Sequence, residues 1–269
     1  MKYDPIKQRL GKIFNAHPIL RKLFYLLLDV LLLRTWHIKK HLKVWARQAP
    51  QDSFVIDAGA GFGQYVFFMS RKYPSWNIVG VDVKDEQVAD CNEFFAKIEK
   101  KDSVQYVRKD LTEYVSAKKA NMILSVDVME HILDDRKVFE NFNKSLVSGG
   151  MLLISTPSDQ GGSDVHDDHE ESFVGEHVRD GYGVGDISEK LYSAGFSQVD
   201  VFYSYGTPGK LSWKLSMKLP ILLINFSSLM YIVLPFYYIC VMPLCLVLNF
   251  FDVAIHHSTG TGLIVKAYK

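Results

Sequence analysis

The sequence predicts a doubly wound α/β fold with a mainly parallel sheet of seven strands. Short apolar runs alternate with helical stretches from residue 53 onward, and the first run ends in a turn with glycine at every second position. Carboxylates stand at the ends of the next runs. Because such an alternation places helices on both faces of a parallel sheet, we expect one α/β domain. The 269 residues are enough for this domain with additions.

The expected strands are short, apolar and β-branched runs that stop at turn residues. They lie at residues 53–57, 77–82, 104–109, 121–126, 151–155, 197–203 and 261–268. Helices are expected at residues 62–73, 85–99, 134–147 and 187–194. Gly195 follows the last of these helices and would cap it.

An apolar insertion separates the last two strands. The α/β domain is expected at residues 51–205 and 260–269, with residues 206–259 as the insertion, in which residues 219–251 carry no charge over 33 positions. Both ends return to one sheet, which excludes an odd number of membrane crossings. Prolines 220, 235 and 243 predict two or three short helices that dip into one leaflet or cover a groove. Lys210, Lys214 and Lys218 precede them on one helical face.

The N-terminal segment, residues 1–50, is expected to form a basic and apolar helical arm. It holds eleven lysines and arginines against two aspartates, and residues 19–33 are strongly apolar. Flanking cations and tryptophans favour a helix at a membrane surface. Packing inside the protein, as a core or lid helix, is the alternative.

The overall composition is that of a globular protein, with 48% hydrophobic and 23% charged residues and a net charge of +1. Cys91, Cys240 and Cys245 suit neither a disulfide framework nor a zinc site. Since no secretory signal is evident, we expect a cytoplasmic protein with peripheral association to the cytoplasmic membrane.

The glycine turn reads Asp57-Ala58-Gly59-Ala60-Gly61-Phe62-Gly63-Gln64. A dinucleotide-binding fingerprint needs glycine where Gln64 stands, which disfavours nicotinamide and flavin cofactors. The turn resembles motif I of the class I S-adenosylmethionine-dependent methyltransferases. The resemblance implies a Rossmann-like methyltransferase fold, an antiparallel pair of last strands, and S-adenosylmethionine held by Asp57, Gly59, Ala60, Gly61 and Gly63.

Further carboxylates are expected to hold the cofactor. Asp82 lies 23 residues after Gly59, where an acid binds ribose hydroxyls, and Val83 follows it. The resemblance implies that Asp110 and Leu111 contact adenine. Asp127 ends the fourth strand and would face the methyl donor. The alternatives are a strand-end cap for Asp82 and a helix N-cap for Asp110.

The acceptor side is predicted around Met129-Glu130-His131, which resembles an element of quinone-biosynthesis and related small-molecule methyltransferases. Methyl transfer is an in-line displacement, so alignment supplies most of the acceleration. His131 suits a base near neutral pH, with Glu130 beside it, although it could equally be a helix-start residue. His177, Arg179 and Tyr182 resemble a segment that caps the acceptor pocket, with a structural role as the alternative.

A cluster of histidines and acids, residues 166–171, lies in a loop after the fifth strand. Metal binding is conceivable from these residue types, but acids and histidines in loops usually meet solvent. We therefore predict no metal site.

Taken together, the motifs predict methyl transfer to a hydroxyl or carbon of a lipophilic small molecule, such as a quinone precursor, a lipid or a polyene-like compound, at the membrane surface. One alternative is a soluble methyltransferase whose insertion builds a homodimer. Another is a non-catalytic scaffold with a relic fold. Nucleic acid is not an expected partner, because Asp127-Val128-Met129-Glu130 stands where base-modifying enzymes often carry two prolines.

Overall fold

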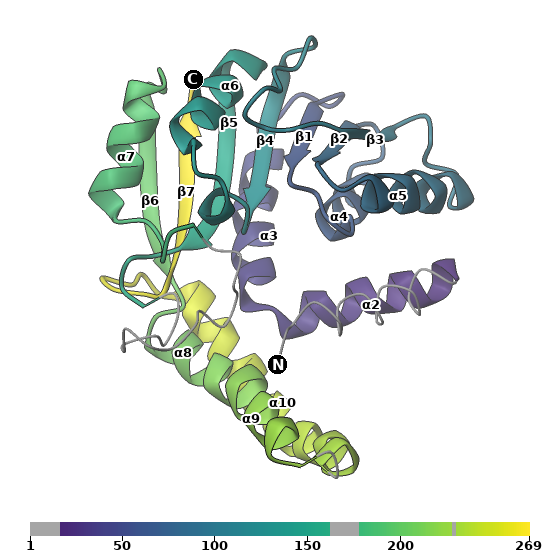
Figure 1. Cartoon of the computed structure of the whole chain (residues 1–269), viewed down its shortest axis with the longest axis vertical. Helices are drawn as coiled ribbons and strands as arrows, with labels where there is room; N and C mark the ends of the chain where they lie inside the picture. Colours follow the sequence, from purple (N-terminus) through teal and green to yellow (C-terminus); the bar gives the residue numbers. More distant parts are fainter. Residues whose placement is uncertain (1–16, 162–177, 228–229) are drawn as a thin grey trace.

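A seven-stranded sheet organises the computed structural model, which describes residues 17–161, 178–227 and 230–269 (Figure 1). The strand order is β3-β2-β1-β4-β5-β7-β6. The strands are β1 (Phe54–Ala58), β2 (Asn77–Asp82), β3 (Val104–Arg108), β4 (Ala120–Val126), β5 (Leu146–Pro157), β6 (Gln198–Ser204) and β7 (Gly262–Tyr268). β1 to β5 pair in parallel, and β7 is antiparallel to both β5 and β6. The predicted fold class is confirmed.

One strand boundary was predicted wrongly. β5 begins at Leu146, before Gly149 and Gly150, rather than at residue 151. Its pairing with β4 shifts register between Ala120 and Met122, so the extra residues bulge out of the ladder. Gly149 adopts a left-handed conformation with φ of 74°, which a residue with a Cβ adopts only at a cost.

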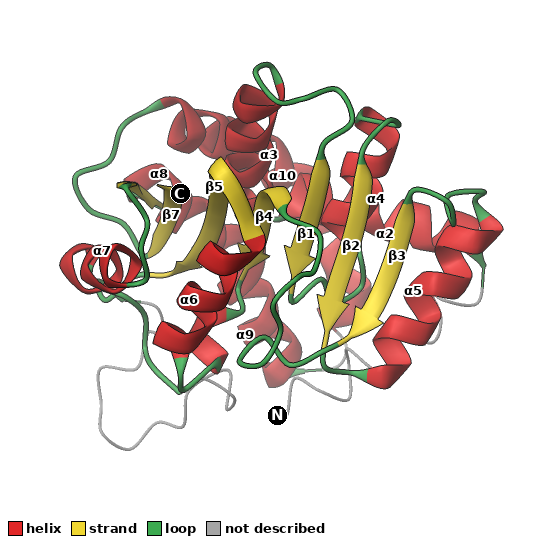
Figure 2. Cartoon of the chain, turned by 90° about the horizontal axis from the view of Figure 1, so that it is seen from above, coloured by secondary structure: helices red, strands yellow, loops and turns green. Residues whose placement is uncertain are grey.

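Helices cover both faces of the sheet (Figure 2). α3 (Leu33–Ala46), α4 (Gln64–Lys72) and α5 (Asp85–Lys97) pack on one face, and α6 (Asp135–Ser145) and α7 (Val184–Ser193) on the other. Neighbouring residues of β4 serve opposite layers: Leu124 belongs to the first core and Ile123 to the second. Since Ile38 and Leu42 of α3 are fully buried in the first core, this part of the predicted arm is a layer of the domain.

The insertion forms a long helical hairpin that projects from the domain (Figure 1). Its outward limb runs through α8 (Thr207–Trp213), a π-helical turn (Lys214–Lys218) and α9 (Leu219–Phe226). α10 (Met230–Ala254) returns as a single helix through Pro235 and Pro243, so the prediction that prolines divide it into short helices was wrong. A proline removes only one hydrogen bond of the ladder. The rest of the 25-residue ladder and the packing of α10 against α8 keep the helix continuous.

Two tyrosine hydroxyls tie the limbs of the hairpin together. Pro220 has no amide, so carbonyls one turn earlier lose their helical donor. Tyr237 donates to the Leu215 carbonyl oxygen at 2.7 Å, and Tyr238 to that of Ser216 at 2.9 Å. Because an unsatisfied carbonyl is costly away from water, these bonds stabilise the π-helical turn where the limb meets Pro220.

The base of the hairpin is polar and buried. Asp252 is 0% exposed. Its Oδ2 accepts from the Gly209 amide at 2.9 Å, and its Oδ1 lies 2.8 Å from Nε2 of His37 in α3. His257 Nε2 lies 3.2 Å from the Oδ2 atom of Asp252. These contacts join α10, α8 and α3 and anchor the hairpin to the domain.

Within the described residues, α10 alone is long and apolar enough to cross a membrane by length and composition. Only 6% of its most apolar 18-residue window is buried. An apolar helix left so exposed needs a partner of some kind.

Candidate functional site

A glycine turn links β1 to α4. Gly59, Gly61 and Gly63 all adopt positive φ, at 77°, 49° and 83°, which residues with a Cβ rarely do. The amides of Gly59 and Ala60 donate to the Val81 carbonyl oxygen at 2.8 and 3.0 Å and fix the turn against β2. α4 then begins without a side-chain cap, so its first amides remain available to a ligand.

Asp82 completes this turn from the end of β2. Its carboxylate accepts from the amide of Gly61 and from that of Lys84, each at 2.9 Å. Each oxygen keeps a lone pair, and the side chain is half-buried, so hydroxyl donors can still reach it. Val83 beside it is 53% exposed.

Asp57 lies beneath the turn and is almost fully buried. Its Oδ2 has no hydrogen-bond partner among the described residues. Burial, and then the nearby charge of Asp82, raises the pKa of Asp57 to about 8. Asp57 therefore keeps its proton at neutral pH in the protein alone, and a ligand that brings positive charge would favour its ionised form. S-adenosylmethionine, with its ammonium and sulfonium groups, meets this requirement.

Asp110 stands exposed just beyond the end of β3, the neighbour of β2. Its Oδ1 accepts from the amide of Thr112 at 2.8 Å and from its hydroxyl at 2.7 Å. Leu111, which follows, is buried. Asp110 and Asp82 therefore share one edge of the sheet, and the predicted adenine contact stays a prediction.

Asp127 leaves β4 in a left-handed conformation with φ of 51°. It forms an ion pair with Arg34, at the start of α3, and the Arg34 amide donates to the Tyr205 hydroxyl at 3.1 Å. In the sequence, Arg34 is one of the cations that flank the apolar stretch of residues 19–33. No local signal could have paired it with Asp127, because the two residues are 93 positions apart.

Glu130 and His131 lie in a short 3-10 turn, Met129–His131, beside Asp127. Glu130 is 1% exposed and accepts from the Thr156 hydroxyl at 3.1 Å. Burial, and then the charge of Asp127, raises the pKa of Glu130 to about 8. Glu130 therefore holds its proton at neutral pH and cannot act as a base there, whereas half-buried His131 remains the candidate base.

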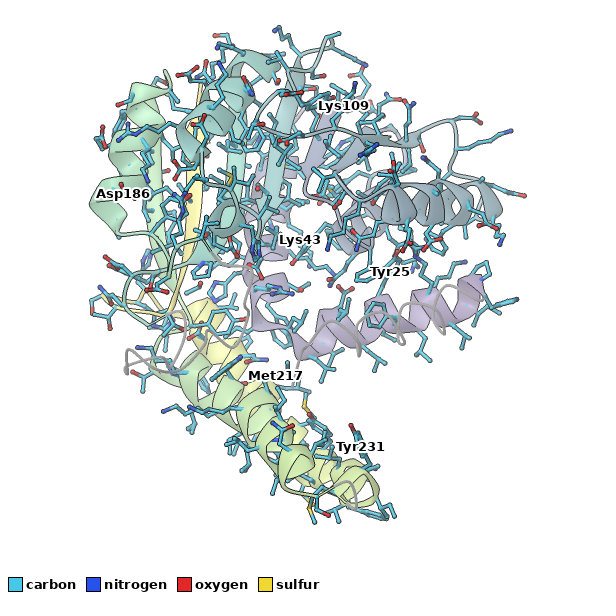
Figure 3. The ribbon with its side chains drawn as sticks, in the orientation of Figure 1. Tyr25, Lys43, Lys109, Asp186, Met217 and Tyr231 are labelled. Carbon is cyan, nitrogen blue, oxygen red and sulfur yellow. The ribbon has the colours of Figure 1, made fainter. Side chains whose placement is uncertain are left out.

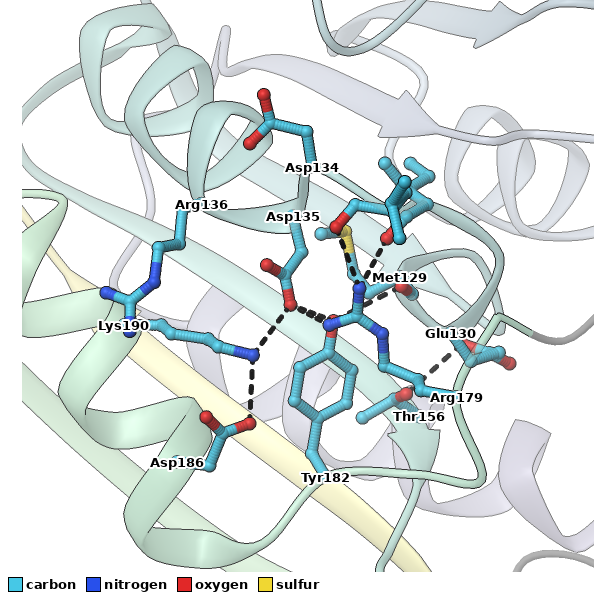
Figure 4. A network of polar contacts seen from close by, with 12 residues as sticks. Met129, Glu130, Asp134, Asp135, Arg136, Thr156, Arg179, Tyr182, Asp186 and Lys190 are labelled. Atoms are coloured by element: carbon cyan, nitrogen blue, oxygen red, sulfur yellow. Dashed lines mark hydrogen bonds and ion pairs between the residues drawn. The ribbon is translucent and has the colours of Figure 1, made fainter.

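Tyr182 belongs to a buried polar network rather than to an open pocket (Figure 4). It is 0% exposed, and its hydroxyl donates to Asp135 Oδ2 at 2.7 Å and accepts from Arg179 Nη1 at 2.9 Å. Lys190 joins Asp135 from α7 at 3.0 Å. These contacts favour a structural role for Tyr182 and Arg179 over a catalytic one.

Two predicted features lie outside the described residues: His177 and the acid and histidine cluster 166–171. Within residues 17–161, 178–227 and 230–269, no group of histidines, cysteines and acids is arranged to hold a metal ion.

Replacing Asp135 with asparagine is expected to lower the free energy of unfolding by about 2 kcal/mol at pH 7, because Arg179 and Lys190 would lose their buried counter-charge. Burial alone would raise the pKa of Asp135, but hydrogen bonds from Tyr182 and Lys190 and the charge of Arg179 lower it overall. A depressed carboxyl pKa stabilises above the unfolded value, about 4, and this stabilisation disappears as pH falls through the folded value.

Urea unfolding from pH 7 down to pH 3 measures this. The gap between the two proteins should shrink as the pH falls below about 4. Glu189→Gln, which removes an exposed ion pair with Arg136, is the control and should leave the midpoint unchanged. A gap for Asp135→Asn that does not vary with pH would contradict the ion-pair origin.

The strand order reverses between β1 and β4, and the glycine turn, Asp82 and Asp127 all lie at this switch point. Ligands of open α/β sheets bind at such crevices, outside the carboxyl ends of the strands. Fold and site thus define a doubly wound domain that binds a nucleoside-containing cofactor.

Comparison with known proteins identifies a methyltransferase domain in part of the chain. A methyltransferase domain model matches residues 56–152. Malonyl-[acyl-carrier protein] O-methyltransferase 2 of Ilyobacter polytropus is 23% identical over 120 residues, 45% of each chain. Phosphoethanolamine N-methyltransferase 1 of Triticum aestivum is 33% identical over 128 residues, 42% of this chain and 25% of that protein. The chain thus spans less than half the length of these relatives.

A solved structure supports the same fold. Phosphoethanolamine N-methyltransferase 2 of Haemonchus contortus, in complex with phosphomonomethylethanolamine and S-adenosylhomocysteine, superposes with a TM-score of 0.58 at 20% identity, over 86% of this chain and 52% of that one. Residues 56–152 thus form a methyltransferase domain, whose cofactor is S-adenosylmethionine.

Proposed function

We propose that this protein transfers a methyl group from S-adenosylmethionine to a lipophilic small molecule while seated on a membrane surface. The observation that carries the proposal is the helical hairpin, whose distal half is apolar and exposed (Figure 3, where Tyr231 marks its far end). Its large exposed side chains include Leu222, Tyr231, Ile232, Val233, Phe236 and Ile239.

The charges on the hairpin set how deep it can enter lipid. Lys210, Lys214 and Lys218 are the last charged residues of the outward limb. Only α9, eight residues long, lies beyond them, which is about 12 Å of helix. The hydrocarbon core is about 30 Å thick. The hairpin therefore suits insertion into one leaflet. The three lysines would then lie among the headgroups, and buried Asp252 with its partners would lie outside the bilayer.

A substrate dissolved in the bilayer is reached most readily by an enzyme that rests on its surface. The names of the relatives give phosphoethanolamine and malonyl-acyl carrier protein as their acceptors. For this chain the exposed apolar hairpin favours an acceptor that partitions into lipid.

The site residues can support such a transfer by alignment. When bound, S-adenosylmethionine supplies an electrophilic methyl group. The glycine turn and Asp82 would fix the position of its ribose end. Asp57, which lies beneath the turn, would face the positive charge of the cofactor. Half-buried His131 can accept the proton of an acceptor hydroxyl, while neutral Glu130 can donate a hydrogen bond.

The test combines flotation on phosphatidylcholine and phosphatidylglycerol vesicles with transfer of labelled methyl groups to lipid-soluble extracts. We expect the native protein to float and to label an extractable product. Leu222→Asp with Phe236→Asp should abolish flotation and lower the labelling at least tenfold, while S-adenosylhomocysteine still binds.

Val115→Asp replaces an exposed apolar residue in the β3–β4 connection and is the matched control, which should float normally. Native protein that ignores vesicles and forms a concentration-dependent dimer would instead support a soluble enzyme that buries its hairpin between copies. Donor binding without transfer to any lipid-soluble or soluble acceptor would favour the scaffold alternative.

A further inference from the structure

The helix α2 (Pro18–Leu31) has its polar and apolar faces reversed. Its two buried residues are Arg21 and Tyr25, at 3% and 1% exposure. Its leucine-rich side is exposed instead: Ile19, Leu20, Leu23, Leu26 and Leu27 are between 37% and 66% exposed. A helix packed on a soluble domain normally buries its apolar stripe. Among the described residues, nothing covers the apolar face of α2.

The inner face of α2 holds the donor turn. Arg21 Nη2 donates to the carbonyl oxygen of Phe62 at 2.9 Å, and Arg21 Nε to the Tyr25 hydroxyl at 2.7 Å. The Tyr25 hydroxyl itself donates to the same Phe62 oxygen. Phe62 stands between Gly61 and Gly63, so α2 is bonded directly to the turn that receives the cofactor (Figure 3 shows Tyr25 pointing into the domain).

The guanidinium of Arg21 is further fixed by α5. Its Nη1 donates to the Asp90 carbonyl oxygen at 3.0 Å, and it lies over the ring of Phe94, 4.7 Å from the centroid. If α2 were displaced, it would therefore either carry the Phe62 carbonyl with it or break its hydrogen bonds to that carbonyl.

The exposed charge on α2 itself is positive. Its one acid, Asp29, is neutralised from inside by Lys39 and by a hydrogen bond from Gln64 at 2.8 Å. Exposed Lys22 lies among the outward leucines. A cation among exposed leucines suits a helix that lies in the headgroup layer.

The position of α2 fits the same bilayer as the hairpin. Both elements extend on one side of the domain, below the sheet in the view of Figure 1. A bilayer that takes up the hairpin tip can thus also meet the leucines of α2, which a small protein partner could not do over so wide a surface.

We propose that the outer face of α2 is a second contact with anionic bilayers and that this contact steadies the donor turn, so that bilayer binding and cofactor binding strengthen each other. This inference rests on the membrane-surface function proposed above. Coupling between the two sites is reciprocal by thermodynamic necessity. The element that both sites bias is α2, through the Phe62 carbonyl.

The test measures the affinity for S-adenosylhomocysteine by calorimetry, without vesicles and with vesicles of phosphatidylcholine, pure or mixed with phosphatidylglycerol. We expect the mixed vesicles to tighten binding by about fivefold and pure phosphatidylcholine to have little effect, a coupling typical of allosteric sites. Leu23→Asp with Leu27→Asp should keep the affinity measured without vesicles and lose the enhancement.

Val115→Asp serves again as the control and should keep the full enhancement. The inference is overturned if the double variant retains the enhancement, or if it already binds more weakly without vesicles, since the leucines would then act within the fold. Native protein that floats and methylates an extractable acceptor, yet binds donor equally with and without vesicles, would overturn the coupling alone. Protein that neither floats nor methylates would overturn the proposed function with it.

Discussion

Asp82→Ala is expected to weaken S-adenosylmethionine binding at least a hundredfold. The carboxylate lies at the carboxyl end of β2 with a free lone pair on each oxygen, and we predict that these lone pairs accept from two ribose hydroxyls. A hydrogen bond to a charged group contributes about 1.5–3 kcal/mol, and two of them correspond to two orders of magnitude or more in affinity. Isothermal calorimetry of donor binding measures the effect.

The same substitution also removes the acceptor of the Gly61 and Lys84 amides, so a loosened turn must be separated from lost ribose contacts. S-adenosylhomocysteine and its 2′,3′-dideoxy analogue make this distinction. The native protein should prefer the hydroxylated ligand strongly, and the variant should bind both alike. Asp85→Ala, three residues further in an exposed ion pair with Arg108, should leave both affinities unchanged. An equal preference in native protein and variant would exclude the ribose contact.

The backbone of the glycine turn and the place of Asp82 could be anticipated from sequence because their determinants are local. Positive φ at Gly59, Gly61 and Gly63 is something that glycine itself permits, and a carboxylate at a strand end has only one edge of the sheet to face. Strand positions followed from runs of apolar residues for the same reason. The β5 bulge escaped prediction, since it depends on how Leu146 to Met151 pairs with β4.

Other features depend on contacts between distant segments. Arg21 and Tyr25 lie within the apolar stretch of residues 19–33, yet they hold the Phe62 carbonyl oxygen across 41 and 37 positions. The continuity of α10 through Pro235 and Pro243 depends on its packing against the outward limb, which no pattern within α10 reveals. Glu130 was predicted beside a base, but its burial, which the sequence could not show, leaves it protonated.

Asp57→Asn is expected to stabilise the protein without cofactor at pH 8 and, at the same time, to weaken donor binding by about ten- to a hundredfold. Burial and the charge of Asp82 raise the pKa of Asp57 to about 8, and its Oδ2 finds no partner in the described chain. Without cofactor, the ionised form of Asp57 therefore strains the folded protein. A cationic ligand relieves this strain, and asparagine has no charge to offer it.

The sign of the pH dependence follows from proton uptake. With a folded pKa of about 8 for Asp57 and an unfolded value near 4, the folded protein binds more protons between these limits. The free energy of unfolding of the native protein should therefore fall as the pH rises from about 4 to 8. Glu130, with its pKa also raised to about 8, acts in the same direction, so Asp57→Asn should flatten this slope without removing it.

Denaturant unfolding between pH 5 and 8, with and without S-adenosylmethionine, tests both the predicted gain in stability and the predicted loss of donor affinity. Asp102→Asn, an exposed change of the same chemistry, should alter neither the slope nor the affinity. If Asp57→Asn left the slope unchanged, Asp57 would have to be solvated or paired in the folded protein. If it bound the donor as tightly as the native protein, the charge beneath the glycine turn would serve folding alone. A gain in stability coupled to a loss of affinity is the combination expected of a carboxylate kept unpaired for its ligand.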